Sequence, residues 1–268
     1  MKIIPPDFFP TTEAQVVRVL WEAEDFFGGA PALMDLRVAL APLSEIPSPR
    51  ARMQAQKDGN GLEIWVAESV HQVWLWRPGF SLHLDFAGGK GEALLAGPPF
   101  WQNVLRVIYF HFFLPRQGLL LHAAGLVHRQ MAFIFPGPSG AGKTSIVRQS
   151  QEMAVLSDEV TVLQLSGNGK GAVAHGTPFY GDWGRPVADF SARVKGVYFP
   201  IHAEEDRVIP LSPRETLARL LPCVFTYTNR RPLMAKLLAV AAKAAETIPA
   251  FALHFRPGPD FWQVIDAC

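Results

Sequence analysis

The chain has 268 residues, of which 49% are hydrophobic and 18% are charged. This composition excludes an intrinsically disordered protein and predicts one large or two modest globular domains. The formal net charge is +1, and no run of five like charges occurs. A nucleic-acid partner held by a broad basic surface is therefore disfavoured, and we expect any bound anion to be gripped locally.

Cysteine usage and apolar runs indicate the compartment. Cys223 and Cys268 cannot form a disulfide framework, and residues 1–10 lack the cationic start and long apolar run of a signal peptide. The most apolar stretch, residues 104–114, is well short of the ~20 residues that cross a bilayer. We therefore expect a cytoplasmic protein without a membrane segment.

The first part of the chain has the pattern of a small β-sheet. Apolar and polar residues alternate over residues 80–86, and residues 62–68 and 72–76 are similar neighbours. Glycine and proline turns over residues 88–99 mark a plausible joint. We predict a β-rich accessory region over residues 1–95 that contributes recognition or packing.

Residues 96–268 are predicted to form a second, catalytic domain that mixes helices and strands. Helices are expected where apolar residues recur every three to four positions, and Ser212 to Glu215 reads as a capping box. Two apolar runs joined by three polar residues predict a β-hairpin. The expected helices cover residues 101–112, 213–222 and 232–247, and the expected hairpin strands cover residues 119–127 and 131–136.

Residues 137–144 match the Walker A phosphate loop, G-x-x-x-x-G-K-[ST], directly after the second hairpin strand. The glycines let backbone N–H groups converge on nucleotide phosphates, and the helix that follows adds its positive end. Lys143 would reach the β- and γ-phosphates, and Thr144 would supply a hydroxyl ligand for Mg²⁺. The sequence thus predicts an ATP site formed by Gly137, Pro138, Ser139, Gly140, Ala141, Gly142, Lys143, Thr144 and Ser145.

Two carboxylates follow the loop closely. Asp158 and Glu159 end a short apolar strand. Asp158 lies fifteen positions after Lys143. A helix of about ten residues descends ~15 Å and a five-residue strand climbs back ~16 Å, which returns both carboxylates to the level of the loop. One carboxylate would help to hold Mg²⁺, and the other would accept a proton from an attacking hydroxyl. The alternative is that Asp158 or Glu159 only caps a solvent-exposed turn and has no catalytic role.

The spacing separates several classes of phosphate-loop protein. Motor and transporter ATPases take their second acidic motif from a strand much later in the chain, so they are disfavoured. Small-molecule kinases of the shikimate or nucleoside type stay open as an alternative, although residues after Glu159 look like strands and turns instead of an arginine-rich lid. A nucleotide-binding regulatory protein without phosphotransfer is a third possibility.

Three elements in order, Leu121-His-Ala-Ala-Gly125, the phosphate loop and Leu156-Ser-Asp-Glu159, resemble the kinase domain of HPr kinase/phosphorylase and its bacterial relatives. The resemblance covers about residues 117–211. It implies an α/β fold, a phosphoenolpyruvate-carboxykinase-like P-loop kinase domain beside the smaller β-rich region. It also implies transfer of the γ-phosphate of ATP to a serine-type hydroxyl, with Asp158 as acid/base, His122 beside it and Thr144 on Mg²⁺.

The chain departs from that family in three ways. Ser145 stands where the family has a glutamate, and Glu159 stands where it has a second aspartate. The family's later Glu-Ile-Arg-Gly-Leu-Gly signature is also not visible, and residues 193–198 are the nearest candidate. The acceptor therefore stays open as a peptide, a protein or a small molecule. Residues 175–185 have the composition of a loop over an active site. Substrate or transition-state contacts are accordingly expected from Thr177, Asp182, Arg185 and Arg193. The remaining histidines show no metal-ligand spacing, so no zinc site is expected.

Overall fold

A computed structural model describes residues 11, 13–21, 32–49, 53–57, 63–69, 71–150, 152–167, 171–179, 181, 190–256 and 258–267. The chain divides into two compact units, Met1–Pro115 with Thr226–Met234, and Arg116–Phe225 with Ala235–Cys268. The predicted boundary lay at 95/96, whereas this division falls after the helix that follows.

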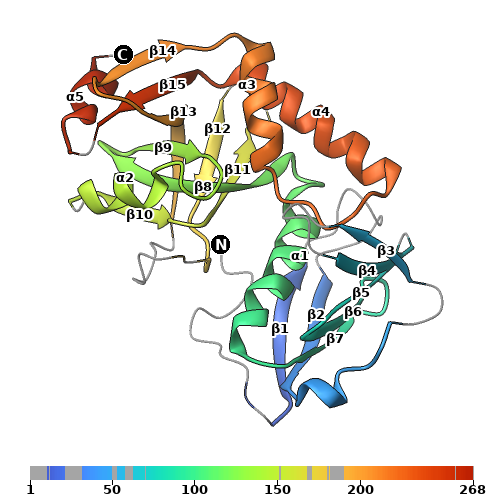
Figure 1. The fold of residues 1–268 in the computed structure, drawn as a ribbon. Helices are drawn as coiled ribbons and strands as arrows, with labels where there is room; N and C mark the ends of the chain where they lie inside the picture. Colours follow the sequence, from blue (N-terminus) through green and yellow to red (C-terminus); the bar gives the residue numbers. More distant parts are fainter. Residues whose placement is uncertain are drawn as a thin grey trace. The chain divides into compact units, whose positions relative to one another are not determined.

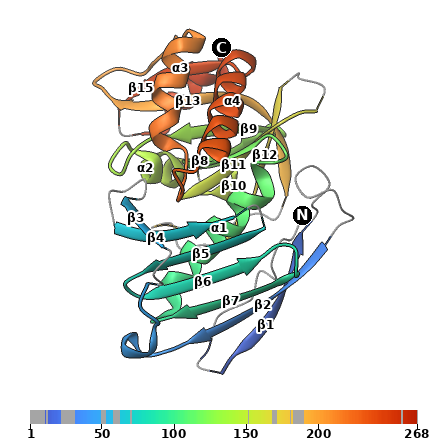
Figure 2. The same ribbon diagram turned by 90° about the vertical axis from the view of Figure 1, so that its right-hand side faces the viewer.

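The first unit holds a seven-stranded sheet in the order β1-β2-β7-β6-β5-β4-β3 (Figures 1 and 2). Only the β2–β7 pair is parallel among its described strand pairs. The strands are β1 (Gln15–Trp21), β2 (Ala32–Leu40), β3 (Gln54–Lys57), β4 (Glu63–Glu68), β5 (Gln72–Arg77), β6 (Phe80–Asp85) and β7 (Lys90–Leu95).

Period-two patterning creates the buried face of this sheet. In β6, Phe80, Leu82 and Leu84 are buried and the residues between them are not, as the alternation predicted. Helix α1 (Trp101–Phe113) lies across one face of the sheet, and nine of its thirteen residues are buried (Figure 2). The predicted strands 62–68 and 72–76 and helix 101–112 are thus confirmed. Residues 88–99 hold β7, an interior strand of the sheet, instead of only turns.

A polar cluster fastens residues 226–230 within the first unit. The buried Tyr227 hydroxyl donates to Glu68 Oε1 at 2.6 Å, and it is also hydrogen-bonded to His111 Nε2. Thr228 Oγ1 donates to the second Glu68 oxygen at 2.5 Å. Because the Tyr227 proton goes to Glu68, His111 must be the donor in its own bond to Tyr227.

Burial lowers the pKa of His111 to about 3, and the charge of Arg230 acts in the same direction. In the unfolded chain His111 has its ordinary pKa of 6.5. Below that pH the unfolded state therefore binds a proton at His111 that the folded state does not bind, which favours unfolding. This stability is fully present above pH 6.5 and is lost as the pH falls toward 3. We expect a loss of up to about 2 kcal/mol between pH 8 and pH 5 from this group.

The measurement is the urea midpoint of the wild type and of His111→Gln at both pH values. Glutamine keeps a donor for Tyr227 but does not titrate, so its midpoint should fall less on acidification than that of the wild type. Equal acid sensitivity in the two proteins would contradict the assignment.

The second unit is built on an eight-stranded sheet whose strands close partly on themselves. Strand β8 pairs with β9 and β11, β9 pairs with β13, and β13 pairs with β12, which returns to β11. The strands are β8 (Gly118–His128), β9 (Met131–Pro136), β10 (Ala154–Ser157), β11 (Val160–Leu165), β12 (Ala172–His175), β13 (Ser191–His202), β14 (Arg207–Pro210) and β15 (Ala250–Phe255).

The predicted α/β fold class is wrong. The described residues form more strand than helix, arranged as two sheets, and they include a closed five-stranded β-barrel. In the second unit only β13 runs parallel to its neighbours β9 and β15, and the other described strand pairs there are antiparallel. The parallel sheet that an α/β kinase domain would require is therefore not formed by the described strands.

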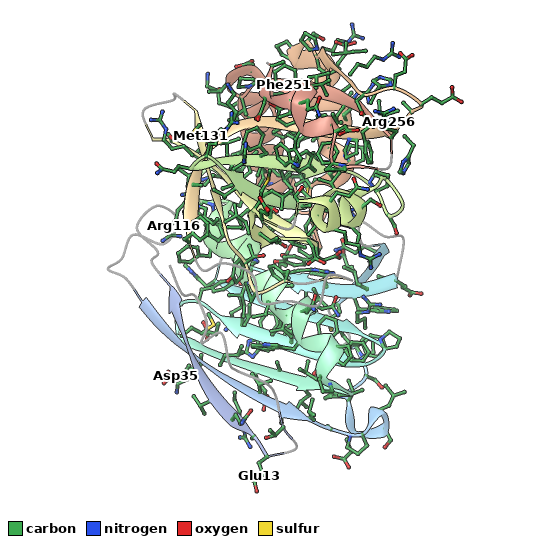
Figure 3. The ribbon with its side chains drawn as sticks, turned by 90° about the vertical axis from the view of Figure 1, so that its left-hand side faces the viewer. Glu13, Asp35, Arg116, Met131, Phe251 and Arg256 are labelled. Atoms are coloured by element: carbon green, nitrogen blue, oxygen red, sulfur yellow. The ribbon has the colours of Figure 1, made fainter. Side chains whose placement is uncertain are left out.

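The second unit also contains α2 (Lys143–Gln149), α3 (Pro213–Leu220), α5 (Phe261–Asp266) and most of α4 (Arg231–Thr247). The capping box at Ser212 is formed as predicted, and the hairpin and the helices from 213 and 232 are confirmed. Phe135, Tyr198, Phe255 and Trp262 share one buried core, against which Met131 and Phe251 pack. Figure 3 shows the positions of Met131 and Phe251 in this unit. Among the described residues, no helix is long and apolar enough to cross a membrane.

Candidate functional site

The central residues of β8 join the phosphate loop to the two carboxylates. His122 accepts through its carbonyl oxygen from Gly137 N–H at 3.2 Å, where the loop begins. The next residue, Ala123, donates its N–H to the Glu159 carbonyl oxygen at 3.1 Å. One strand thus holds the loop on one side and the carboxylate turn on the other.

The phosphate loop depends on glycine backbone geometry. Gly140 and Gly142 have φ values of 80° and 98°, which residues with side chains rarely adopt. A Cβ at Gly137 would lie 2.7 Å from the Ala141 Cβ, so the loop closes tightly on itself. The helix that follows, α2, has only seven residues. We therefore attribute phosphate binding to the backbone N–H groups of the loop and to Lys143, and not to the N-terminus of this short helix.

Lys143 lies inside the loop with its side chain almost fully buried, at 6% exposure for the residue. Its ammonium group donates to the carbonyl oxygens of Gly137 and Pro138, both at 2.9 Å. Burial lowers the pKa of Lys143, while the charge of the Glu159 carboxylate acts in the opposite direction. A positive charge is thus held at the floor of the loop, where it can bind an anion strongly.

A serine shapes the turn that presents the carboxylates. Ser157, at the end of β10, is fully buried and accepts through Oγ from the N–H groups of Glu159 and Val160 at 3.1 and 2.9 Å. The same hydroxyl donates to the Phe179 carbonyl oxygen at 3.0 Å. This local turn breaks the strand between β10 and β11 and aims residues 158 and 159 at the loop.

The two carboxylates have different surroundings. Asp158 is 3% exposed, and its Oδ1 accepts from the Gly181 N–H at 2.8 Å. Glu159 Oε2 lies 3.6 Å from His122 Nε2, and these two side chains are 30% and 35% exposed. A Cβ on Gly181 would lie 3.2 Å from Asp158 and 3.3 Å from Glu159, so the glycine backbone closely covers both carboxylates.

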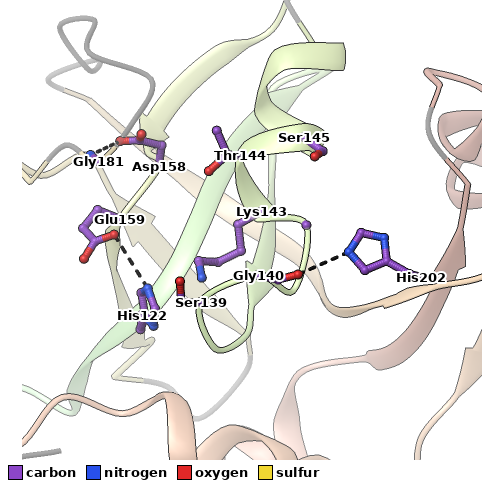
Figure 4. Close-up of a pocket in the computed structure, with 11 residues that line it drawn as sticks. His122, Ser139, Gly140, Lys143, Thr144, Ser145, Asp158, Glu159, Gly181 and His202 are labelled. Carbon is purple, nitrogen blue, oxygen red and sulfur yellow. Dashed lines mark hydrogen bonds and ion pairs between the residues drawn. The ribbon is translucent and has the colours of Figure 1, made fainter. Parts of the chain in front are cut away.

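These groups line one cavity of about 410 Å³ (Figure 4). That volume lies within the usual range for small-ligand sites. Its lining comprises His122, Ser139, Gly140, Gly142, Lys143, Thr144, Ser145, Asp158, Glu159, Gly181 and His202. The side chains of the predicted catalytic and metal-binding residues therefore meet around one space.

The cavity residues fit a nucleoside triphosphate together with Mg²⁺. Loop amides and Lys143 supply donors and positive charge for phosphates, and Thr144 with Asp158 or Glu159 supplies oxygen ligands for the metal. The described residues contain no group of three or more His, Cys, Asp or Glu side chains placed to hold a metal by themselves. Mg²⁺ commonly uses one or two carboxylates together with substrate phosphates, which matches this set.

The expected substrate contacts fare differently. Thr177 is buried and donates through Oγ1 to the Val160 carbonyl oxygen at 2.5 Å, so it supports the strands instead of lining the cavity. Arg193 is exposed at the start of β13, opposite Met131 at the start of β9. It therefore lies at the end of the strands away from the loop. Asp182 and Arg185 fall outside the described residues.

Two lining residues escaped sequence reasoning. Gly181 belongs to the segment 175–185, which composition marked as a loop, but nothing in the sequence singles out its N–H as a partner of Asp158. His202 ends β13 and reaches the loop because β13 runs parallel to β9. The position of His202 beside the loop follows from this strand pairing, which cannot be read from the sequence.

No family model matches the chain, and no curated protein matches it either. The chemistry of the cavity must therefore carry any functional assignment.

Proposed function

We propose that this chain is an ATP-dependent kinase that transfers phosphate to the hydroxyl group of a peptide, protein or small molecule. The observation that carries the proposal is the meeting of a phosphate loop, a buried lysine and two carboxylates around one cavity. The sequence resemblance to HPr kinases supports the same reaction type, independently of the fold.

The residues would divide the work by their surroundings. Lys143 and the loop amides would hold the phosphates, while Thr144 and Glu159 would hold Mg²⁺. Bound Mg·ATP would supply the γ-phosphoryl group. Asp158 would accept the proton of the acceptor hydroxyl, and its bond from Gly181 keeps the carboxylate oriented. His122, whose Nε2 lies 3.6 Å from Glu159 Oε2, would help to position that carboxylate.

The site suits the cytoplasm, where ATP is plentiful, and we propose that location. Serine-type phosphate esters survive acid, which sets them apart from phosphohistidine. The test is therefore to incubate the protein with γ-labelled ATP, Mg²⁺ and an extract of the source cells, and to measure acid-stable label.

We expect label on a discrete acceptor with the wild type and none with Lys143→Met. Release of inorganic phosphate without any labelled acceptor would contradict transfer. ATP binding without turnover would instead favour a nucleotide-binding regulatory protein.

A further inference from the structure

His202 has an exposed aromatic ring beside the phosphate loop. It ends β13, opposite Phe255 at the end of the parallel strand β15. The two rings are 5.1 Å apart at an interplanar angle of 33°, and Phe255 is only 1% exposed. A buried aromatic residue thus supports the His202 ring from one side, while the ring itself stays exposed and lines the cavity.

The loop is fitted to this aromatic pair. A Cβ on Gly142 would lie 2.5 Å from Phe255 Cζ and 3.1 Å from His202 Cε1, so the loop backbone rests directly against both rings. His202 Nε2 lies 3.2 Å from the Gly140 carbonyl oxygen, to which it can donate. The ring is therefore held in one orientation before any ligand arrives, which lowers the entropy cost of binding against it.

The position of His202 gives the cavity a direction. Figure 4 shows it beside Gly140, on the other side of the loop from His122, Asp158 and Glu159. The phosphate that is transferred must lie beside the carboxylates, because one of them takes the acceptor proton. The rest of the nucleotide then has to extend past the loop, away from those carboxylates, toward His202.

We infer that His202 is the stacking platform for the base of the phosphate donor, an inference that rests on the proposed function. Stacking on an aromatic ring is tolerant of base identity because every base has a π-face. His202 accordingly favours nucleoside triphosphates over bare polyphosphates, with little discrimination between ATP and GTP.

The test compares calorimetric affinities for ATP, GTP and inorganic tripolyphosphate, each with Mg²⁺. For His202→Ala we expect a loss of about tenfold for both nucleotides, in line with measured stacking effects, and a change within twofold for tripolyphosphate. His202→Phe should keep nucleotide affinity near that of the wild type. The control is His254→Ala, which removes a histidine from the neighbouring strand β15 that does not line the cavity.

Other outcomes overturn the inference in distinguishable ways. If His202→Phe weakens tripolyphosphate as much as ATP, and His202→Gln restores both, the histidine serves only to hold Gly140 through its hydrogen bond. Unchanged ATP affinity in His202→Ala, with tripolyphosphate still bound, removes the platform and leaves the proposed kinase intact. If the wild type binds neither ATP nor tripolyphosphate, the proposed function fails and the platform fails with it.

Discussion

Replacing Lys143 by methionine is expected to lower the affinity for Mg·ATP by about 10- to 100-fold. The ammonium group is the buried positive charge of the loop, and hydrogen bonds to charged groups contribute about 1.5–3 kcal/mol each. Methionine keeps the length and apolar stem of lysine, although it loses the two hydrogen bonds to the Gly137 and Pro138 carbonyl oxygens. Isothermal titration calorimetry with ATP, with and without Mg²⁺, measures the effect.

The control is Lys243→Met on helix α4. Lys243 is 54% exposed and lies 3.6 Å from Glu246, so its loss removes a charge without altering the cavity. We expect wild-type ATP affinity for that variant. A companion variant, Thr144→Val, should lose the gain that Mg²⁺ gives while keeping metal-free affinity. Wild-type ATP affinity in Lys143→Met would show that the phosphate loop does not bind ATP through Lys143, and would contradict the proposed ATP site.

The local chemistry of the site was readable because it lies in short stretches of sequence. The phosphate loop needs glycines at positions with positive φ, and Gly140 and Gly142 have such values. The return of Asp158 and Glu159 to the loop followed from the length of the intervening segment, and all of these residues line one cavity. Helix patterns such as the capping box at Ser212 are equally local.

Apart from the hairpin of β8 and β9, strand pairing was not readable from the sequence. The error in fold class came from the family resemblance, which implied an α/β fold. The apolar run of β8 is typical of a strand buried on both faces, which is common in parallel sheets. In this chain the same burial arises because β8 belongs to a closed barrel, where both faces are also covered. Turn residues misled in a similar way: Gly88 and Gly89 resemble a linker but form the turn between β6 and β7.

Long-range strand pairing also decides which end of β13 lies beside the phosphate loop. Arg193 and His202 lie on the same strand, β13, yet only His202 is at the end beside the loop. The parallel alignment of β13 with β9 makes that choice, across a separation of some sixty residues. Charge and composition favoured Arg193 as a phosphate contact. This prediction was wrong because neither property reveals the direction in which the strand runs.

The kinase proposal itself rests on Asp158. Asp158→Asn is expected to lower phosphate transfer by ~10²-fold or more while ATP affinity stays within a few-fold of the wild type. Asparagine has nearly the same shape, and its amide oxygen can still accept the 2.8 Å bond from Gly181. It cannot take a proton from an acceptor hydroxyl at neutral pH. Initial rates of acid-stable labelling, measured beside calorimetric ATP affinity, separate these two effects.

Two further variants make the result for Asp158 decisive. Asp260→Asn neutralises an exposed carboxylate, paired with Arg256 at 3.2 Å, and should leave transfer unchanged. Glu159→Gln should raise the Mg²⁺ concentration needed for transfer, because that carboxylate is assigned to the metal. If Glu159→Gln abolishes transfer at saturating Mg²⁺ while Asp158→Asn retains it, the two roles are reversed. If neither variant alters transfer or ATP turnover, the carboxylates form only a turn, and hydroxyl activation by this pair is wrong for the protein.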